Sequence, residues 1–122
     1  MSVTMDETSG LDVQIDRPEG ATVVRLSGEM DLASCGRLRS AAMDDLLQGL
    51  VILDLAALSF CDSSGLRVLF DMQRRVNGAK AGFRLAGPSA VVGRLLELSG
   101  ALDFFDVCPD VATALAAPAG RG

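Results

Sequence analysis

The chain has 122 residues, 49% of them hydrophobic, and a formal net charge of −5. This length fits one compact domain. The acidic balance excludes the basic patch that nucleic-acid binding requires, and the apolar stretches are too short and too interrupted to span a membrane.

The first third of the chain predicts a hairpin followed by a helix. Alternating apolar residues predict a half-buried strand at 11–15, and a turn at 17–20 leads into a second, antiparallel strand at 22–26. The helix begins with either Asp31 or Ser34 as its cap. Its apolar residues recur at helical spacing before Gly49, and they are Leu38, Ala41, Ala42 and Leu46.

The rest of the chain alternates strands and helices. The run 51–55 has almost no polar alternation, which predicts a strand buried on both faces of a sheet. The later elements are a helix at 63–76 with Leu66, Leu69, Phe70 and Val76 facing the sheet, a strand at 83–86, a helix at 91–98, an edge strand at 102–107 and a helix at 111–116 capped by Asp110.

This order of elements predicts an α/β fold in one domain. The mixed sheet has four or five strands, and about four helices cover it. We expect the domain to span 11–117, with a flexible N-terminus at 1–10 and a flexible tail at 118–122. The N-terminus lacks the basic and apolar pattern of a secretion signal, so we expect a cytoplasmic protein.

The segment Asp62-Ser63-Ser64-Gly65-Leu66 directly follows the buried strand and places two hydroxyl groups at the start of a helix. Backbone N–H groups there lack intrahelical partners and carry the positive end of the helix dipole, so a phosphate is favoured. A serine at this point can become a charge switch. The alternative is that the polar residues only cap the helix.

Several kinds of chemistry are excluded or disfavoured by the sequence. The chain contains no histidine, so it cannot build a Ser-His-Asp triad around Ser63. It has neither a phosphate-binding GxxxxGK[ST] loop nor a GxGxxG loop after a strand, so any ATP must come from a partner. Asp54 is a rival candidate as an aspartyl phosphoacceptor, but it lies inside a predicted strand.

The cysteines Cys35, Cys61 and Cys108 show no CxxC spacing, which argues against a zinc site or a disulfide framework and suits a reduced compartment. We therefore predict no metal and no cofactor. Cys61 borders the serine motif, but a free cysteine ordinarily behaves as a small buried apolar residue, and we assign it no chemistry.

Four segments in this order resemble the STAS domain family, and within it the bacterial anti-sigma factor antagonists. They are Leu26-Ser27-Gly28-Glu29-Met30-Asp31, Val51-Ile52-Leu53-Asp54-Leu55, Ser59-Phe60-Cys61-Asp62-Ser63-Ser64-Gly65-Leu66 and Leu98-Ser99-Gly100-Ala101-Leu102-Asp103. The resemblance implies a binding protein and not an enzyme. Its partner would be an anti-sigma factor that is itself a serine kinase, and binding would release a sigma factor.

The resemblance also implies residue roles. Ser63 maps onto the phosphoacceptor, and Asp31 in the Gly-Glu-x-Asp loop lies near it. We expect Asp31, Asp62, Ser63, Ser64 and Gly65 to form the partner-binding surface, and a metal-dependent serine phosphatase to reset the switch.

Some alternatives stay open. Ser64 is the second candidate acceptor, and Asp31 has a helix cap as its other interpretation. Arg67 is treated as a solvated arginine outside the site, although it could steady the phosphate. The other function classes are a STAS subunit of a transporter or signalling assembly without phosphotransfer and, as a distant third, a hydrolase. The sequence leaves dimer formation open.

Overall fold

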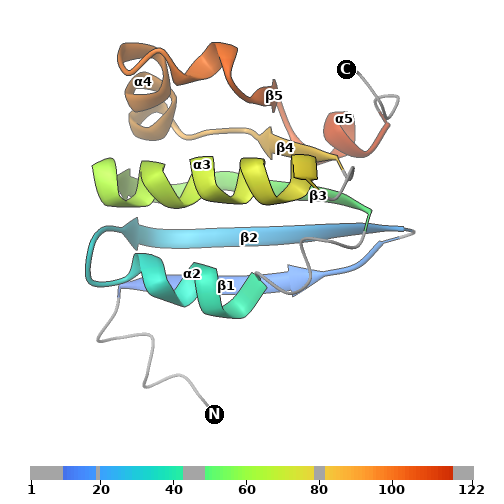
Figure 1. Ribbon diagram of the computed structural model, residues 1–122, viewed down its shortest axis with the longest axis horizontal. Coiled ribbons are helices and arrows are strands. Elements are labelled where there is room, and N and C mark those ends of the chain that lie inside the picture. The colour runs from blue at the N-terminus through green and yellow to red at the C-terminus, as the bar shows by residue number, and fades with distance from the viewer. Residues whose placement is uncertain (1–9, 19, 43–48, 79–81, 117–122) are drawn as a thin grey trace.

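A five-stranded mixed sheet forms the centre of the protein (Figure 1). The computed structural model describes residues 10–18, 20–42, 49–78 and 82–116. The strands follow one another in the sheet in chain order. β1 pairs antiparallel with β2, and all later pairs are parallel. The strands are β1 (Leu11–Asp16), β2 (Ala21–Met30), β3 (Leu50–Cys61), β4 (Phe83–Ala86) and β5 (Asp106–Cys108).

The described residues also form four α-helices and one short 3₁₀ helix. In Figure 1, α2 and α3 lie in front of the sheet, and α4 lies beyond the end of β4. The helices are α2 (Cys35–Ala42), α3 (Ser63–Gly78), α4 (Ala90–Leu98), η2 (Ala101–Asp103) and α5 (Val111–Ala116). The predicted α/β fold with a mixed sheet is therefore confirmed. Apart from Gly10, the termini predicted to be flexible lie outside the described residues.

Strand β3 is buried on both faces at its start, as predicted. Leu53 belongs to the large core beneath α2, α3 and α4, whereas Ile52 belongs to a smaller core beneath α5. Side chains alternate across a strand, so this central strand serves both layers. Arg84 of β4 is also buried on the α5 side, where its guanidinium group donates to the Ala114 carbonyl and pairs with Asp106.

The predicted inward face of α3 is only partly right. Leu69 is fully buried, but Leu66 and Phe70 are only partly buried, and the side chain of Val76 lies outside the described residues. The residues that join Leu69 in the core are Val68 and Met72. Leu66 and Phe70 pack against the margin of the main core, and Phe70 also lies beside Phe104, with ring centroids 4.8 Å apart, so the apolar stripe of α3 serves both the sheet and the segment after η2.

Strands β2 and β3 are longer than predicted because their pairing continues through two irregularities in register, between Arg25 and Ser27 and between Gly28 and Glu29. The Ser59 hydroxyl donates to the Gly28 carbonyl across this stretch at 2.8 Å. The extra length carries both strands to the edge of the sheet where the serine motif begins.

The predicted edge strand at 102–107 is wrong over most of its length. Its first residues belong to η2, and only three residues form β5. Gly100, in a left-handed conformation with φ of 78°, ends α4 and begins η2, which accounts for the difference.

The predicted cap of the last helix is confirmed, and α4 has a serine cap that the sequence analysis did not name. The Asp110 carboxylate accepts a hydrogen bond from the Thr113 N–H at 2.7 Å, and this bond lowers the pKa of Asp110. The Ser89 hydroxyl accepts from the Val92 N–H at the start of α4.

Gly28 holds the start of β1 against β2. The Gly10 carbonyl accepts a hydrogen bond from the Glu29 N–H at 2.8 Å. Gly28 has a φ of 97°, and a Cβ atom built on it would overlap this same carbonyl oxygen. Glycine is therefore required by the backbone conformation and also by the space available.

The first prediction follows from this contact. We expect Gly28→Ala to lower the free energy of unfolding by about 3 kcal/mol, because strain and overlap add together. Gly20→Ala is the control, because Gly20 also has positive φ but its Cβ atom would meet nothing within 4 Å. Its expected cost is about 1 kcal/mol. Urea denaturation measures both, and equal losses would contradict a specific close approach at Gly28.

Candidate functional site

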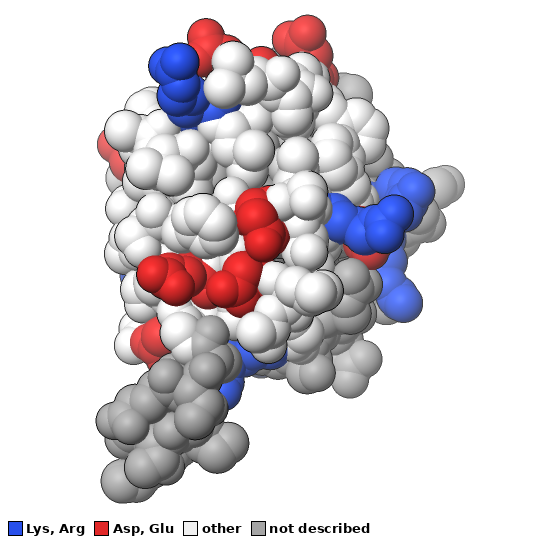
Figure 2. Space-filling model, turned by 90° about the vertical axis from the view of Figure 1, so that its left-hand side faces the viewer, with Lys and Arg blue, Asp and Glu red and all other residues white. Residues whose placement is uncertain are grey.

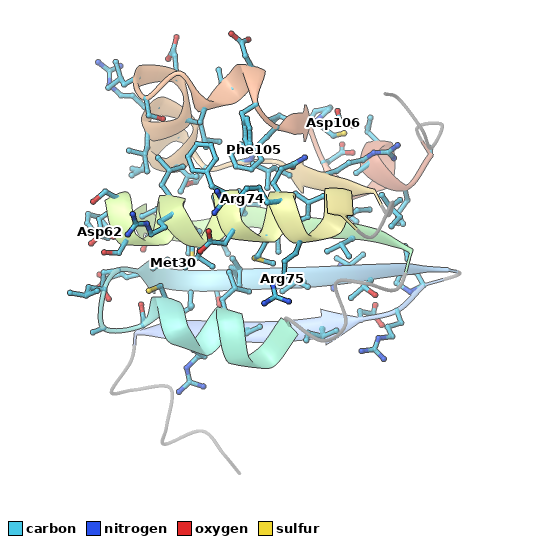
Figure 3. The ribbon with its side chains drawn as sticks, in the orientation of Figure 1. Met30, Asp62, Arg74, Arg75, Phe105 and Asp106 are labelled. Carbon is cyan, nitrogen blue, oxygen red and sulfur yellow. The ribbon has the colours of Figure 1, made fainter. Side chains whose placement is uncertain are left out.

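The ends of β2 and β3 bring the predicted site residues to one edge of the sheet. Met30 and Cys61 are the last residues of the two strands and are partners in the parallel register. Asp31 and Asp62 directly follow them. The Asp62 N–H donates to the Met30 carbonyl at 3.2 Å, and Figure 3 shows Met30 and Asp62 at the same end of the molecule.

Asp62 caps α3, as the alternative interpretation of the motif predicted. Its Oδ1 atom accepts hydrogen bonds from the N–H groups of Ser64, at 2.9 Å, and Gly65, at 3.1 Å. Two of the donors that we expected to meet a phosphate are therefore already occupied by a carboxylate. This corrects the expectation that an anion finds several open N–H groups at this helix start.

Ser63 is the first residue of α3 and is exposed, whereas Ser64 is only partly exposed. An exposed hydroxyl in the first turn of a helix is accessible to an incoming enzyme. The difference in exposure favours Ser63 over Ser64 as the acceptor. The assignment itself stays a prediction.

Gly65 explains how α3 can begin so close to the sheet. It is buried, and a Cβ atom on it would lie 2.8 Å from the Cys61 Sγ atom and 3.0 Å from both the Cγ atom and the carbonyl oxygen of Met30. Any larger residue would push the first turn of α3 outward. Gly65 thus has a packing role, and its predicted part in partner binding stays untested.

The loop after β2 is held by a reciprocal pair of hydrogen bonds. The Asp31 carboxylate accepts from the Ser34 N–H at 3.1 Å, and the Ser34 hydroxyl accepts from the Asp31 N–H at 3.0 Å. The Ser34 hydroxyl also lies 2.9 Å from the Glu29 carbonyl, to which it can donate. We predicted Asp31 or Ser34 as the cap of α2; these side-chain bonds instead hold the loop just before α2 and do not reach the N–H groups of the helix. Ser34 is almost completely buried.

Acidic groups dominate this edge of the sheet. Glu29 lies near the end of β2, and Asp31 and Asp62 follow the ends of β2 and β3. Figure 2, which looks onto this end, shows acidic side chains gathered in the middle of the face. The surface at the ends of β2 and β3 is therefore acidic before any modification.

Cys61 lies beneath this acidic surface. Burial raises the pKa of its thiol to about 12, and the Asp62 and Cys35 charges act in the same direction. The thiol is thus neutral near pH 7, which agrees with assigning it no chemistry.

Two exposed apolar residues at this edge were missed by the sequence analysis. Leu32, directly after Asp31, is 77% exposed, and Phe60, opposite Glu29 in the register, is 43% exposed. Leu32 stands between Asp31 and Ala33 near the predicted helix start, and nothing in this local pattern marked it as exposed. Phe60 continued an apolar run and so gave no such signal.

An open groove of about 400 Å³ runs along α3 from Ser63. It is lined by Ser63, Leu66, Arg67, Phe70, Asp71 and Arg74. The rival acceptor Asp54 lies elsewhere, inside β3, where its carboxylate is 3.4 Å from the Arg25 guanidinium group and accepts from the Ala56 N–H. The described part of the chain holds no cluster of three metal-ligating side chains and no helix long and apolar enough to cross a membrane.

Comparison with known proteins identifies the family. Residues 12–114 match the STAS domain family, so the chain belongs to it. Its relatives include an anti-sigma F factor antagonist from Paenibacillus polymyxa, which is 29% identical over 109 residues that cover 86% of this chain and 92% of the relative.

Three solved structures show the same fold. An anti-sigma factor antagonist from Mycobacterium paratuberculosis superimposes with a TM-score of 0.81 at 25% identity, covering 88% of this chain and 92% of that one. Unphosphorylated SpoIIAA, also an anti-sigma factor antagonist, gives a TM-score of 0.73 at 22% identity, covering 85% and 93%. Its phosphorylated form, from Bacillus, gives 0.68 at 21% identity over 85% and 96%.

The cap at Asp62 leads to a second prediction. Asp62→Ala removes the acceptor of two N–H groups and should lower the free energy of unfolding by about 1 kcal/mol. Asp62→Asn keeps a capping oxygen and should stay within about 0.5 kcal/mol of the parent. Chemical denaturation followed by circular dichroism measures both. If the two variants lost the same stability, the carboxylate charge and not the cap would hold the helix start.

A third prediction concerns the thiols. Cys35 is partly exposed, while Cys61 and Cys108 are buried. Iodoacetamide at pH 8 should therefore label Cys35 first in the native protein. The thiolate is the reactive form, and the Cys61 thiol, with a pKa of about 12, is almost wholly protonated at this pH. Peptide mass spectrometry resolves the sites, with labelling in urea as the control. Native labelling of Cys61 as fast as that of Cys35 would contradict the described burial.

Proposed function

We propose that this chain is an anti-sigma factor antagonist whose activity is switched at Ser63. In its unphosphorylated form it binds an anti-sigma factor that is also a serine kinase, and the sigma factor is released. Phosphorylation of Ser63 ends this contact, and a metal-dependent serine phosphatase restores it. The observation that carries the proposal is the exposed Ser63 hydroxyl in the first turn of α3, in a STAS-family chain with relatives of this class.

The binding surface we propose is the edge of the sheet around Ser63. Asp31, Asp62 and Ser64 supply polar groups, while Leu32 and Phe60 supply exposed apolar area of the kind that anchors protein interfaces. Gly65 contributes by letting α3 sit close to the strand ends.

The charge of a phosphate explains how this surface is switched off. A phosphoserine carries about −1.5 to −2 charges at neutral pH. At Ser63 this charge would be added beside Asp62, whose carboxylate already occupies the N–H groups of Ser64 and Gly65. The added charge repels the nearby carboxylates of Asp31 and Asp62 and must be desolvated at the interface, so binding weakens. No refolding of the domain is needed.

The chain supplies the acceptor and the docking surface, while ATP and magnesium come with the kinase. This division of roles fits the neutral Cys61 thiol and the lack of histidine in the sequence. We propose that the protein works as a binding protein in the cytoplasm, where a sigma factor and its regulators act.

The test combines acceptor mapping with binding. Candidate anti-sigma kinases and ATP are incubated with the parent, Ser63→Ala and Ser64→Ala, and the modified peptide is located by mass spectrometry. We expect phosphate on the parent and on Ser64→Ala, and none on Ser63→Ala. Loss of the phosphate in Ser64→Ala alone would instead identify Ser64 as the acceptor.

Binding to the same kinases is measured by calorimetry. Ser63→Ala should bind like the parent, whereas Ser63→Glu should bind about tenfold or more weakly, because it places a charge at the interface. Equal affinity of both variants would contradict the switch. Binding without any phosphotransfer would favour a STAS interaction subunit of a transporter or signalling assembly.

A further inference from the structure

The groove along α3 places an arginine one helical turn from the candidate phosphoacceptor. Ser63 and Arg67 are separated by four residues on the same helix and line the same groove. Residues four apart on an α-helix have Cβ atoms about 5 to 6 Å apart and lie on one face. The Arg67 side chain is long enough to bring its guanidinium group to a phosphate on the Ser63 oxygen.

The two arginines of the groove differ in their present contacts. The Arg74 guanidinium group lies 2.6 Å from the Asp71 carboxylate, in an ion pair within the helix. Arg67 is exposed and makes no hydrogen bond or ion pair with any residue in the described ranges. Arg75 lies outside the groove, on the side of α3 toward α2 (Figure 3). Arg67 is thus the cation of the groove that is available to an anion at Ser63.

The helix start itself is a poor alternative for holding the phosphate. Asp62 accepts from the N–H groups of Ser64 and Gly65, and its carboxylate repels a second anion. A guanidinium group carries a full charge and a planar fork of donors that matches two phosphate oxygens.

We infer that Arg67 binds the phosphate on Ser63 within the same chain and so sets the charge of the phosphorylated surface. This inference rests on the proposed function, in which Ser63 is the acceptor. Phosphorylation then changes the docking surface twice: an anion appears at Ser63, and the Arg67 guanidinium group is withdrawn from the groove. A partner that contacts the groove through an acidic residue would lose that contact.

The experiment uses phosphoserine installed at position 63 during translation, so that no kinase is required. The second pKa of the phosphoserine is followed by ³¹P NMR in the parent, Arg67→Gln, Arg67→Lys and Arg74→Gln. All four proteins carry phosphoserine at position 63, and circular dichroism verifies that each protein is folded.

A nearby cation favours the dianion and lowers the phosphoserine pKa. Arg67→Gln should therefore raise that pKa by about 0.2 to 0.4, the amount typical of an exposed pair four residues apart on a helix. Arg67→Lys should restore part of the difference, because it keeps the charge but loses the planar fork. Arg74→Gln should leave the pKa near the parent value, because Arg74 is paired with Asp71 and lies farther along α3.

An unchanged pKa in Arg67→Gln would overturn the inference, as would an equal rise in Arg74→Gln, which would indicate only the general field of the helix. The proposed function is tested separately by phosphate transfer to the unmodified chain. If no kinase modifies Ser63 but the pKa responds to Arg67, the proposed function fails while the pairing of the two residues stands. If a kinase modifies Ser63 but the phosphoserine pKa does not respond to Arg67, the proposed switch stands and Arg67 has no part in it.

Discussion

The close contact between the first turn of α3 and the ends of β2 and β3 is the constraint on which the site depends. Gly65 has no side chain, so the helix packs directly against Met30 and Cys61, and a Cβ atom at this position would not fit. Asp62 joins the same elements, because its N–H binds the Met30 carbonyl and its carboxylate caps α3. The exposed hydroxyl of Ser63 is thereby held on a rigid support, directly above a buried core.

This support would let the proposed switch at Ser63 act without a change of fold. Met30 and Cys61 lie below the site within the main apolar core, and the neutral Cys61 thiol adds no charge there. A modification at an exposed serine therefore alters the charge and shape of the surface while the packing beneath stays the same.

The carboxylates of Asp31 and Asp62 stabilise local backbone structure and also contribute to the surface. Asp31 holds the loop before α2 through Ser34, and Asp62 begins α3. Since a carboxylate that caps a helix satisfies backbone donors, it also prevents a second anion from using them. The acidic edge in Figure 2 is thus a consequence of how two helices begin next to the ends of two parallel strands.

Local sequence patterns were enough to predict the hairpin, the doubly buried start of β3 and the helix that begins at the serine motif. Those features depend on residues close together in the chain, such as the cap Asp62 beside Ser63 or the apolar run before it. Long-range packing sets the length of β2 and β3, the rotation of α3 that buries Val68 and Met72, and the packing role of Gly65. These depend on contacts between distant segments, such as the hydrogen bond from Ser59 to Gly28, which local patterns do not contain.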